Sequence, residues 1–345
     1  MEARKMRAHG LDFSTAPGKA QIRRAERFAL ISAALFVIGA ALVARSGNGA
    51  VLDHLWALGK WPVVGLVALT MISLTARAAR WHALTRELGI RNGWRDSFLC
   101  YVAGFAFTLT PGRLGEGIRL WIIRRGNGAR YERTASLLIA DRISDALAMV
   151  LVAAVAAWTF TSHVSLAVLT SLAVIGITVA LVRPAMLLTG VTAAYALLRR
   201  WPRLFARLRT MIRQTQRLMS GRVFACSTLL VAGGWVAEAL ALDWLLQAMG
   251  ANIGLLPVAF AFAVALIIGS LSMLPGGLGG TEATLTFLLL SQGVQLDQAV
   301  ATIVVFRLGT LWLTIALAVL ALPFALRTAA PPLLSDAPGV AGNSG

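Results

Sequence analysis

The sequence predicts an all-α polytopic membrane protein with about six full spans and two re-entrant helical hairpins arranged as an inverted repeat. Of its 345 residues, 58% are hydrophobic and only 14% are charged, and a soluble domain cannot bury that much apolar surface. A Pro-Gly break interrupts apolar sequence at 110–116 and again at 274–282, and an arginine follows each break, Arg142 and Arg307. A bilayer tolerates irregular backbone only where protein or a water-filled cavity covers it, and arginine only with partners. The paired breaks and arginines therefore predict one site built twice, near the middle of the membrane.

The first part of the chain contains two spans and one interrupted segment. Residues 1–27 are polar and basic and form a cytoplasmic N-terminal segment, and residues 28–44 follow as a retained span because no signal-peptide pattern precedes them. A second span runs from about 61 to 79 and is followed by a basic loop. Residues 97–110 number only about 14, whereas a crossing helix needs ~20, and a short helix from 115 to 125 follows the break. The basic loop contains Arg77, Arg80, Arg86, Arg91 and Arg95.

Two more spans and a basic linker follow. Residues 134–160 and 164–182 are long enough to cross and complete a first repeat of about 61–182. The linker at 183–222 holds nine arginines and no acidic residue. Apolar residues recur in it at helical spacing, so 199–222 predicts a basic amphipathic helix on an anionic leaflet; a plain cytosolic linker is the alternative. The apolar stripe consists of Leu204, Phe205, Leu208, Met211, Ile212 and Met219.

The second repeat, at about 223–326, has the same order as the first. A span at 223–248 precedes an apolar segment at 255–274, which ends at the second break. A short helix at 280–292 and a last long span at 298–326 follow. The transmembrane lipid-handling domain is thus expected to cover 28–326, and the tail at 327–345, rich in Ala, Pro and Gly, is expected to be disordered.

The distribution of basic residues sets the predicted orientation. If each interrupted segment returns to the side it entered, the basic loops at 77–96, 119–133 and 183–222 all face the cytoplasm together with both termini. The first hairpin then enters from the inside and the second from the outside, which is the inverted repeat of transporter folds. A single crossing by 97–125 would instead put the arginines of 119–133 outside. The hairpin arrangement satisfies the charge rule with fewer exceptions.

The two breaks have the chemistry of an anion site. Pro111 and Pro275 lack an amide hydrogen and end the preceding helix, and the glycines permit tight turns. The next helix starts near 115 and near 280, where its first amides have no intrahelical partner and attract a phosphate. The alternative is that these residues only close a hairpin. The glycines are Gly112, Gly115, Gly276, Gly277, Gly279 and Gly280.

Charged residues inside the apolar segments supply the remaining candidates. A charge costs ~2.5–3.5 kcal/mol at a helix centre, so these groups neutralise one another, line a wet cavity or hold a ligand. Glu116 and Glu282 sit near helix starts, where helix capping is the alternative. An ion-pair cluster between spans is the structural alternative for the rest. The candidate substrate-binding residues are Pro111, Gly112, Arg113, Gly115, Glu116, Arg119, Asp141, Arg142, Asp145, Glu238, Pro275, Gly276, Gly277, Gly279, Glu282 and Arg307.

Two stretches carry a resemblance to a known family. Phe107 to Glu116 (FTLTPGRLGE), followed by Ile139 to Asp145 (IADRISD), resembles the flippase-like family related to the transmembrane region of lysylphosphatidylglycerol synthases. Leu274 to Glu282 (LPGGLGGTE), with Phe306-Arg307-Leu308, is similar to the second signature of that family. The resemblance implies a polytopic protein that moves or handles lipids, in some members an aminoacylated phospholipid, with hopanoid or polyprenyl-linked glycan pathways associated with others. Synthase members continue into a soluble lysyl-transfer domain, which these 345 residues lack, so lipid lysylation is not expected.

We therefore expect a lipid translocase that binds an anionic or phosphate-containing headgroup between two re-entrant hairpins. A membrane-embedded enzyme acting on a lipid headgroup or polyprenyl phosphate, with Asp141 and Asp145 as base or Mg²⁺ ligands, is one alternative. A non-catalytic partner of a lipid or hopanoid biosynthesis enzyme is another. No nucleotide, metal or other cofactor motif occurs, so no cofactor is expected. The high arginine content follows the loops, so no nucleic-acid partner is expected. The expected location is the inner membrane.

Overall fold

In the part of the chain that the structure describes, every element is helical. The computed structural model describes residues 58–108, 116–129, 131–160, 202–219, 221–272 and 274–328, with 176 and 192 as isolated positions. The predicted spans at 28–44 and, apart from residue 176, at 164–182 lie outside these residues, as do the N-terminal segment and all but the first two residues of the tail.

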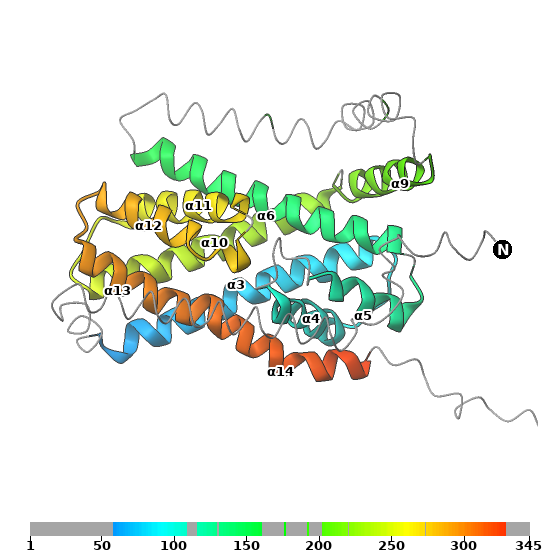
Figure 1. Cartoon of the computed structure of the whole chain (residues 1–345), viewed down its shortest axis with the longest axis horizontal. Coiled ribbons are helices and arrows are strands. Elements are labelled where there is room, and N and C mark those ends of the chain that lie inside the picture. Colours follow the sequence, from blue (N-terminus) through cyan, green and yellow to red (C-terminus); the bar gives the residue numbers. More distant parts are fainter. Residues whose placement is uncertain are drawn as a thin grey trace, which may run out of the picture.

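Long helices run lengthwise through the molecule (Figure 1). Three of the described helical segments are long and apolar enough to cross a membrane: Lys60–Glu87, Arg222–Ala248 and Leu296–Thr328. A fourth long helix covers the predicted span at 134–160. The long elements are α3 (Lys60–Glu87), α6 (Tyr131–Phe160), α10 (Arg222–Ala248) and the continuous run of α13 (Leu296–Arg307), η5 (Leu308–Trp312) and α14 (Leu313–Thr328).

The prediction that a basic loop starts after Ala79 is wrong, because α3 continues to Glu87. Its buried face includes Leu74, Trp81 and Leu84, so the apolar stripe does not stop at the first arginines. Arg80 lies on the same face with no exposed surface. The helix can bury this guanidinium because carboxylates on α6 neutralise it at hydrogen-bonding distance.

The first interrupted segment forms a pair of short helices that start and end at the same end of the molecule. It consists of α4 (Trp94–Ala103), a 3-10 turn η2 (Gly104–Phe107) and α5 (Ile118–Asn127). Asn127, at the end of α5, donates to the side chain of Asn92, just before α4, at 2.7 Å. The residues just before α4 and at the end of α5 are therefore adjacent; that this helical hairpin is re-entrant in the membrane stays a prediction.

The second interrupted segment is built in the same way and lies toward the opposite end (Figure 1). Helix α11 (Leu255–Leu271) leads into the turn η4 (Pro275–Gly277), and α12 (Gly280–Leu290) returns. Gly276 and Gly277 have φ values of 63° and 70°, a region that residues with a Cβ rarely adopt. Gln298, early in α13, donates to the carbonyl of Met249, just after α10, at 3.0 Å, so the loops that flank this hairpin also meet.

Helix α9 (Pro202–Met219) lies within the predicted linker. Its Leu218 and Met219 are buried in an apolar cluster shared with α4 and α5, and Thr215 contacts the carbonyl of Ser136 on α6 at 3.5 Å. Arg213 is exposed. The described apolar side chains at the end of α9 thus pack on protein, while this arginine faces outward.

The helix ends that carry exposed arginines lie together at one end of the molecule, where α3, α5 and α14 end and where α4, α6 and α10 begin (Figure 1). These arginines lie near the ends of α3, α5 and α14, near the starts of α4, α6 and α10, and in α9. Among the described residues of the opposite end, which includes the loops at 249–254 and 291–295, there is no arginine. The exposed arginines are Arg86, Arg91, Arg95, Arg124, Arg125, Arg133, Arg213, Arg217, Arg222 and Arg327.

Candidate functional site

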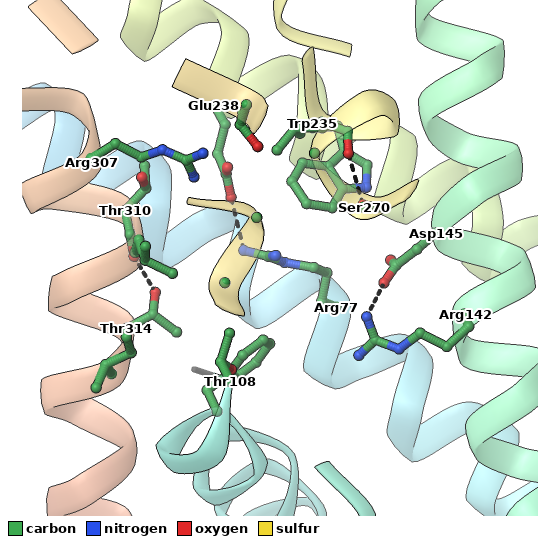
Figure 2. Close-up of a pocket in the computed structure, with 18 residues that line it drawn as sticks. Arg77, Thr108, Arg142, Asp145, Trp235, Glu238, Ser270, Arg307, Thr310 and Thr314 are labelled. Carbon is green, nitrogen blue, oxygen red and sulfur yellow. Dashed lines mark hydrogen bonds and ion pairs between the residues drawn. The ribbon is translucent and has the colours of Figure 1, made fainter. Parts of the chain in front are cut away.

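A polar pocket of about 80 Å³ lies where the two hairpins approach each other. A water molecule needs only about 10–15 Å³ of such space, so the pocket can hold several waters or a small polar group. Figure 2 shows its charged residues converging from α3, α6, α10 and α13. Thr108 follows the first hairpin's η2, and Gly269, Ser270, Gly276, Gly277 and Thr281 belong to the second hairpin. The wall also includes Arg77, Phe105, Arg142, Asp145, Trp235, Glu238, Leu266, Arg307, Thr310, Leu311, Thr314 and Ile315.

Arg77 and Glu238 form the ion pair at the centre of the pocket. Nη2 of Arg77 lies 2.8 Å from Oε1 of Glu238, and the hydroxyl of Ser73 donates to the same oxygen at 2.7 Å. The Arg77 guanidinium also lies 4.6 Å from the centre of the Trp235 ring, a cation–π contact. The pair holds an arginine at the pocket wall with only part of its hydrogen-bonding capacity used.

Arg307 enters the pocket from the opposite wall. Its Nε lies 2.6 Å from Oε1 of Glu282, and Oε2 of Glu282 accepts the amide of Gly279 at 2.7 Å, before α12 begins. Glu282 therefore caps α12 and neutralises Arg307 at once. Nη2 of Arg307 is buried and has no hydrogen-bond partner among the described residues, and an unpaired buried donor is costly. Arg80 and Arg119 also have one such nitrogen each, but of these three arginines Arg307 alone lines the pocket, so its unused donor can meet a further acceptor there.

The π-helix η5 follows Arg307 directly and determines which residues of this run line the pocket. Single π turns inside α-helices occur frequently at functional sites. Thr310 and Thr314 are buried, and their hydroxyls donate to the carbonyls of Phe306 and Thr310 at 2.7 and 2.6 Å. Their oxygens remain available as acceptors.

A sealed ionic cluster lies behind the pocket. Arg80 donates to Asp141 at 2.6 Å and to Asp145 at 2.7 Å, and neither Arg80 nor Asp141 has exposed surface. Arg119 lies 3.6 Å from Asp141 and 3.4 Å from Glu116, and its guanidinium stacks 4.1 Å from the Tyr101 ring. These groups neutralise one another out of reach of solvent.

Arg142 connects the sealed cluster with the pocket. It pairs with Glu116 and lies 3.8 Å from Asp145. About a third of its side chain, 32%, is exposed, in contrast to Arg80 and Arg119. It can therefore reach a ligand from the pocket side while its carboxylate partners remain buried.

The structure divides the predicted site residues into three groups. Arg142, Asp145, Glu238, Gly276, Gly277 and Arg307 line the pocket. Glu116, Arg119 and Asp141 lie in the sealed cluster. Glu282 lies in the first turn of α12 and pairs with Arg307, Gly279 is the exposed residue before α12, and Pro275 begins η4. The predictions for Pro111, Gly112, Arg113 and Gly115 fall on residues outside those described.

Sequence reasoning missed Arg77, Arg80 and Trp235. The two arginines were assigned to a loop because the first apolar run weakens there. Trp81 and Leu84 continue the buried face of α3 beyond that point, and this continuation was the available signal. Trp235 precedes Glu238 by about one helical turn on α10, so the two side chains share a face of that helix. The carboxylate of Glu238 in an apolar span was the signal that this face lines a polar site.

Apolar long helices around a buried ionic site define a helical membrane protein. Residues 28–318 match the family described as the lysylphosphatidylglycerol synthase transmembrane region. The chain belongs to this family, which confirms the resemblance carried by its two signatures.

Two relatives agree with this assignment. The chain is similar to a UPF0104 membrane protein of Methanothermobacter thermautotrophicus, with 27% identity over 323 residues that cover 85% of this chain and 95% of the relative. It is also similar to a UPF0104 membrane protein of Pyrococcus horikoshii, with 26% identity over 282 residues that cover 72% of this chain and 83% of the relative.

Proposed function

We propose that this chain is a lipid translocase that binds an anionic or phosphate-containing headgroup in the pocket between the two hairpins. One observation carries the proposal: three arginines of different helices, Arg77, Arg142 and Arg307, line a single polar pocket inside an apolar helical protein. Guanidinium groups offer planar forks of donors that match phosphate oxygens. A structural ion-pair cluster alone would not need a pocket.

In the structure, carboxylates pair with the arginines that we propose as ligand-binding groups. Glu238 holds Arg77 and Glu282 holds Arg307. A headgroup phosphate takes the place of these carboxylates, and the free Nη2 of Arg307 gives it an immediate donor. Rocking of one repeat against the other then exposes the pocket to the opposite leaflet, as in other transporters built from repeats.

The two hairpins support an inverted repeat with re-entrant segments in the membrane. Each hairpin has its ends together, and the two pairs lie toward opposite ends of the molecule (Figure 1). The gathering of exposed arginines at one end supports a cytoplasmic location for that end and for the C-terminus. On this arrangement the protein is a multi-pass protein of the inner membrane, and α9 lies at the cytoplasmic surface with arginines directed at anionic lipids.

The enzyme alternative has less support. A base or a Mg²⁺ ligand must present a free carboxylate oxygen to the substrate or metal. Arg80 pairs with one oxygen, Oδ1, of Asp141 and of Asp145 at less than 3 Å. The second oxygen of Asp141 has no hydrogen-bond partner among the described residues but is buried, and Asp141 does not line the pocket. The second oxygen of Asp145 lies 3.8 Å from Arg142.

Reconstitution into liposomes tests the proposal. Purified protein is combined with a panel of labelled phospholipids and polyprenyl phosphates, and leaflet exchange is followed together with thin-layer analysis of the lipid. We expect exchange of at least one phosphate-containing lipid without chemical change. A chemically altered lipid would support the enzyme instead, and no exchange or alteration of any lipid would contradict both functions.

A further inference from the structure

Among the carboxylates around the pocket, Glu238 relies most strongly on one arginine, Arg77, for the neutralisation of its charge. In the described part of the chain, Arg77 is its only cationic partner within 4 Å, and the Glu238 side chain is only 5% exposed. Its other partner, the Ser73 hydroxyl, carries no charge. If Arg77 turned away, Glu238 would remain as a buried carboxylate without a counter-ion.

The other carboxylates around the pocket each have a second partner for their negative charge. Asp145 has both Arg80 and Arg142, and Asp141 lies near Arg80, Arg119 and Arg142. Glu282 has the amide of Gly279 as a second partner and is 20% exposed. Each of these groups therefore keeps a partner or a route to water when one arginine engages a ligand.

Binding an anion at Arg77 therefore has a predictable consequence for Glu238. An ionised carboxylate left unpaired in a buried site is strongly disfavoured, and a carboxyl group in that position neutralises by taking up a proton. The protonated group can still accept the hydrogen bond from Ser73. The ligand's negative charge is then balanced by Arg77, and Glu238 no longer competes for it.

We propose that binding of an anionic headgroup in this pocket takes up one proton and that Glu238 receives it. The inference rests on the proposed function, because it requires an anion to engage Arg77. In this step Glu238 takes a proton from hydronium or from a buffer acid: the carboxyl O–H bond forms, the bond of that proton to its donor breaks, and the donor is left as water or as the buffer base. The headgroup charge and the proton then occupy the site together, so a singly charged phosphodiester is carried without a change in the net charge of the site.

The charged groups that face Glu238 from neighbouring helices are consistent with this role. Arg77 on α3 is in contact, Arg142 and Asp145 on α6 lie across the pocket, and Arg307 on α13 approaches from its side (Figure 2). Helix α11 has no titratable side chain. Helix α9 connects to the start of α10, at Arg222, whereas Asp243 lies near the other end of α10. Among these groups, Arg77 is the one that is both in contact with Glu238 and open to a ligand.

Calorimetry on the detergent-solubilised full chain tests the proposal. The probe is glycerophosphoglycerol, a phosphodiester whose charge is constant between pH 5 and 8. Titrations in two buffers with different ionisation enthalpies give the number of protons taken up for each probe molecule bound. Repeating them from pH 8 to 5 gives the pH dependence of the affinity. Glu238→Gln keeps the shape and the acceptor for Arg77, and Asp243→Asn is the matched control, a buried carboxylate of the same helix paired with Gln247.

We expect about one proton per probe in the wild-type protein, with affinity rising up to about tenfold for each unit fall in pH where Glu238 changes state. Glu238→Gln should bind with almost no proton uptake and little pH dependence, while Asp243→Asn should match the wild type. Binding without proton uptake in the wild type, or unchanged uptake in Glu238→Gln, overturns this inference and leaves the proposed function intact. If the wild type does not bind the probe, and no labelled lipid exchanges in liposomes, the proposed function itself fails. Even if Glu238→Gln does not fold, the wild-type buffer comparison decides whether binding takes up a proton, and an uptake near zero still overturns the inference.

Discussion

The buried arginines of this protein differ in what surrounds them, and the difference separates binding from structure. Arg307 lines the pocket and keeps an unused buried donor. Arg80 does not line the pocket and has no exposed surface, and its two terminal nitrogens pair with two aspartates, so its unpaired Nε cannot meet a ligand there. Charge and residue type are the same, so only the environment indicates that one is prepared for a ligand and the other stabilises the fold.

Replacement of Arg307 tests the first role. Arg307→Ala removes charged hydrogen bonds worth about 1.5–3 kcal/mol, so lipid exchange in liposomes should fall roughly 10- to 100-fold, with insertion and yield unchanged. Arg307→Lys should rescue only in part, because an ammonium lacks the planar fork. Leu308→Ala, an adjacent exposed position, is the control. Exchange at the wild-type rate in Arg307→Ala would remove this arginine from the site.

Replacement of Arg80 tests the second role. Arg80→Ala leaves Asp141 and Asp145 buried with weaker partners, a change that costs about 3–5 kcal/mol in comparable buried pairs. We expect a clearly lower midpoint of thermal unfolding in detergent. Arg86→Ala, on an exposed turn of the same helix, should leave the midpoint almost unchanged. Equal midpoints in the two variants would show that the sealed cluster is not structural.

At the scale of elements, the second hairpin depends on close contact between its two helices. A Cβ built on Gly269 of α11 would lie 1.9 Å from the Thr281 hydroxyl of α12, so only glycine permits this spacing. Both residues also line the pocket. The contact that sets the spacing of the two hairpin helices therefore also shapes the wall of the pocket.

Gly269→Ala should destabilise the hairpin by about 1–3 kcal/mol, the usual cost of overpacking. Thermal unfolding in detergent measures this loss. Thr281→Ala removes the obstructing hydroxyl, so the double variant should recover much of the lost stability. A double variant no more stable than Gly269→Ala would show that this contact does not set the helix spacing.

The whole molecule places its exposed arginines at one end and its two hairpins toward opposite ends (Figure 1). On the orientation that we propose from the positive-inside rule, the arginine-rich end faces the cytoplasm and each hairpin has its ends at one surface of the membrane. The arrangement also explains how two short hairpins can meet at one pocket: each covers about half of the distance that a long helix covers.

Single-cysteine labelling tests the orientation. In a Cys226→Ser background, Asn92→Cys and Asn127→Cys should react with a membrane-impermeant maleimide only from the cytoplasmic side. Ser291→Cys and Leu296→Cys should react only from the opposite side. Cys100 is buried and should stay unlabelled. Labelling of positions 92 and 127 from different sides would show that the first hairpin crosses the membrane.

The membrane class, the family and the broken helices were predictable from local sequence. Composition alone excludes a soluble domain, and the Pro-Gly breaks interrupt helices wherever they occur, because proline lacks the amide and glycine permits the turn. Charged residues inside apolar runs also predicted a buried ionic site, because burying any one of these charges in the membrane without a partner would cost too much free energy. Arg142, Glu238 and Arg307 were found in this way.

The partners of these charges were decided only by the tertiary structure. Arg80 and Asp141 are far apart in sequence, and nothing local distinguishes Arg80, sealed against α6, from Arg77, open to the pocket one helical turn away. Packing of α3 against α6 and α10 makes that distinction. Sequence therefore determined that charges are buried in this membrane protein, whereas the folded arrangement decided which of them are neutralised permanently and which remain available to a ligand, because ion pairing depends on distance in space.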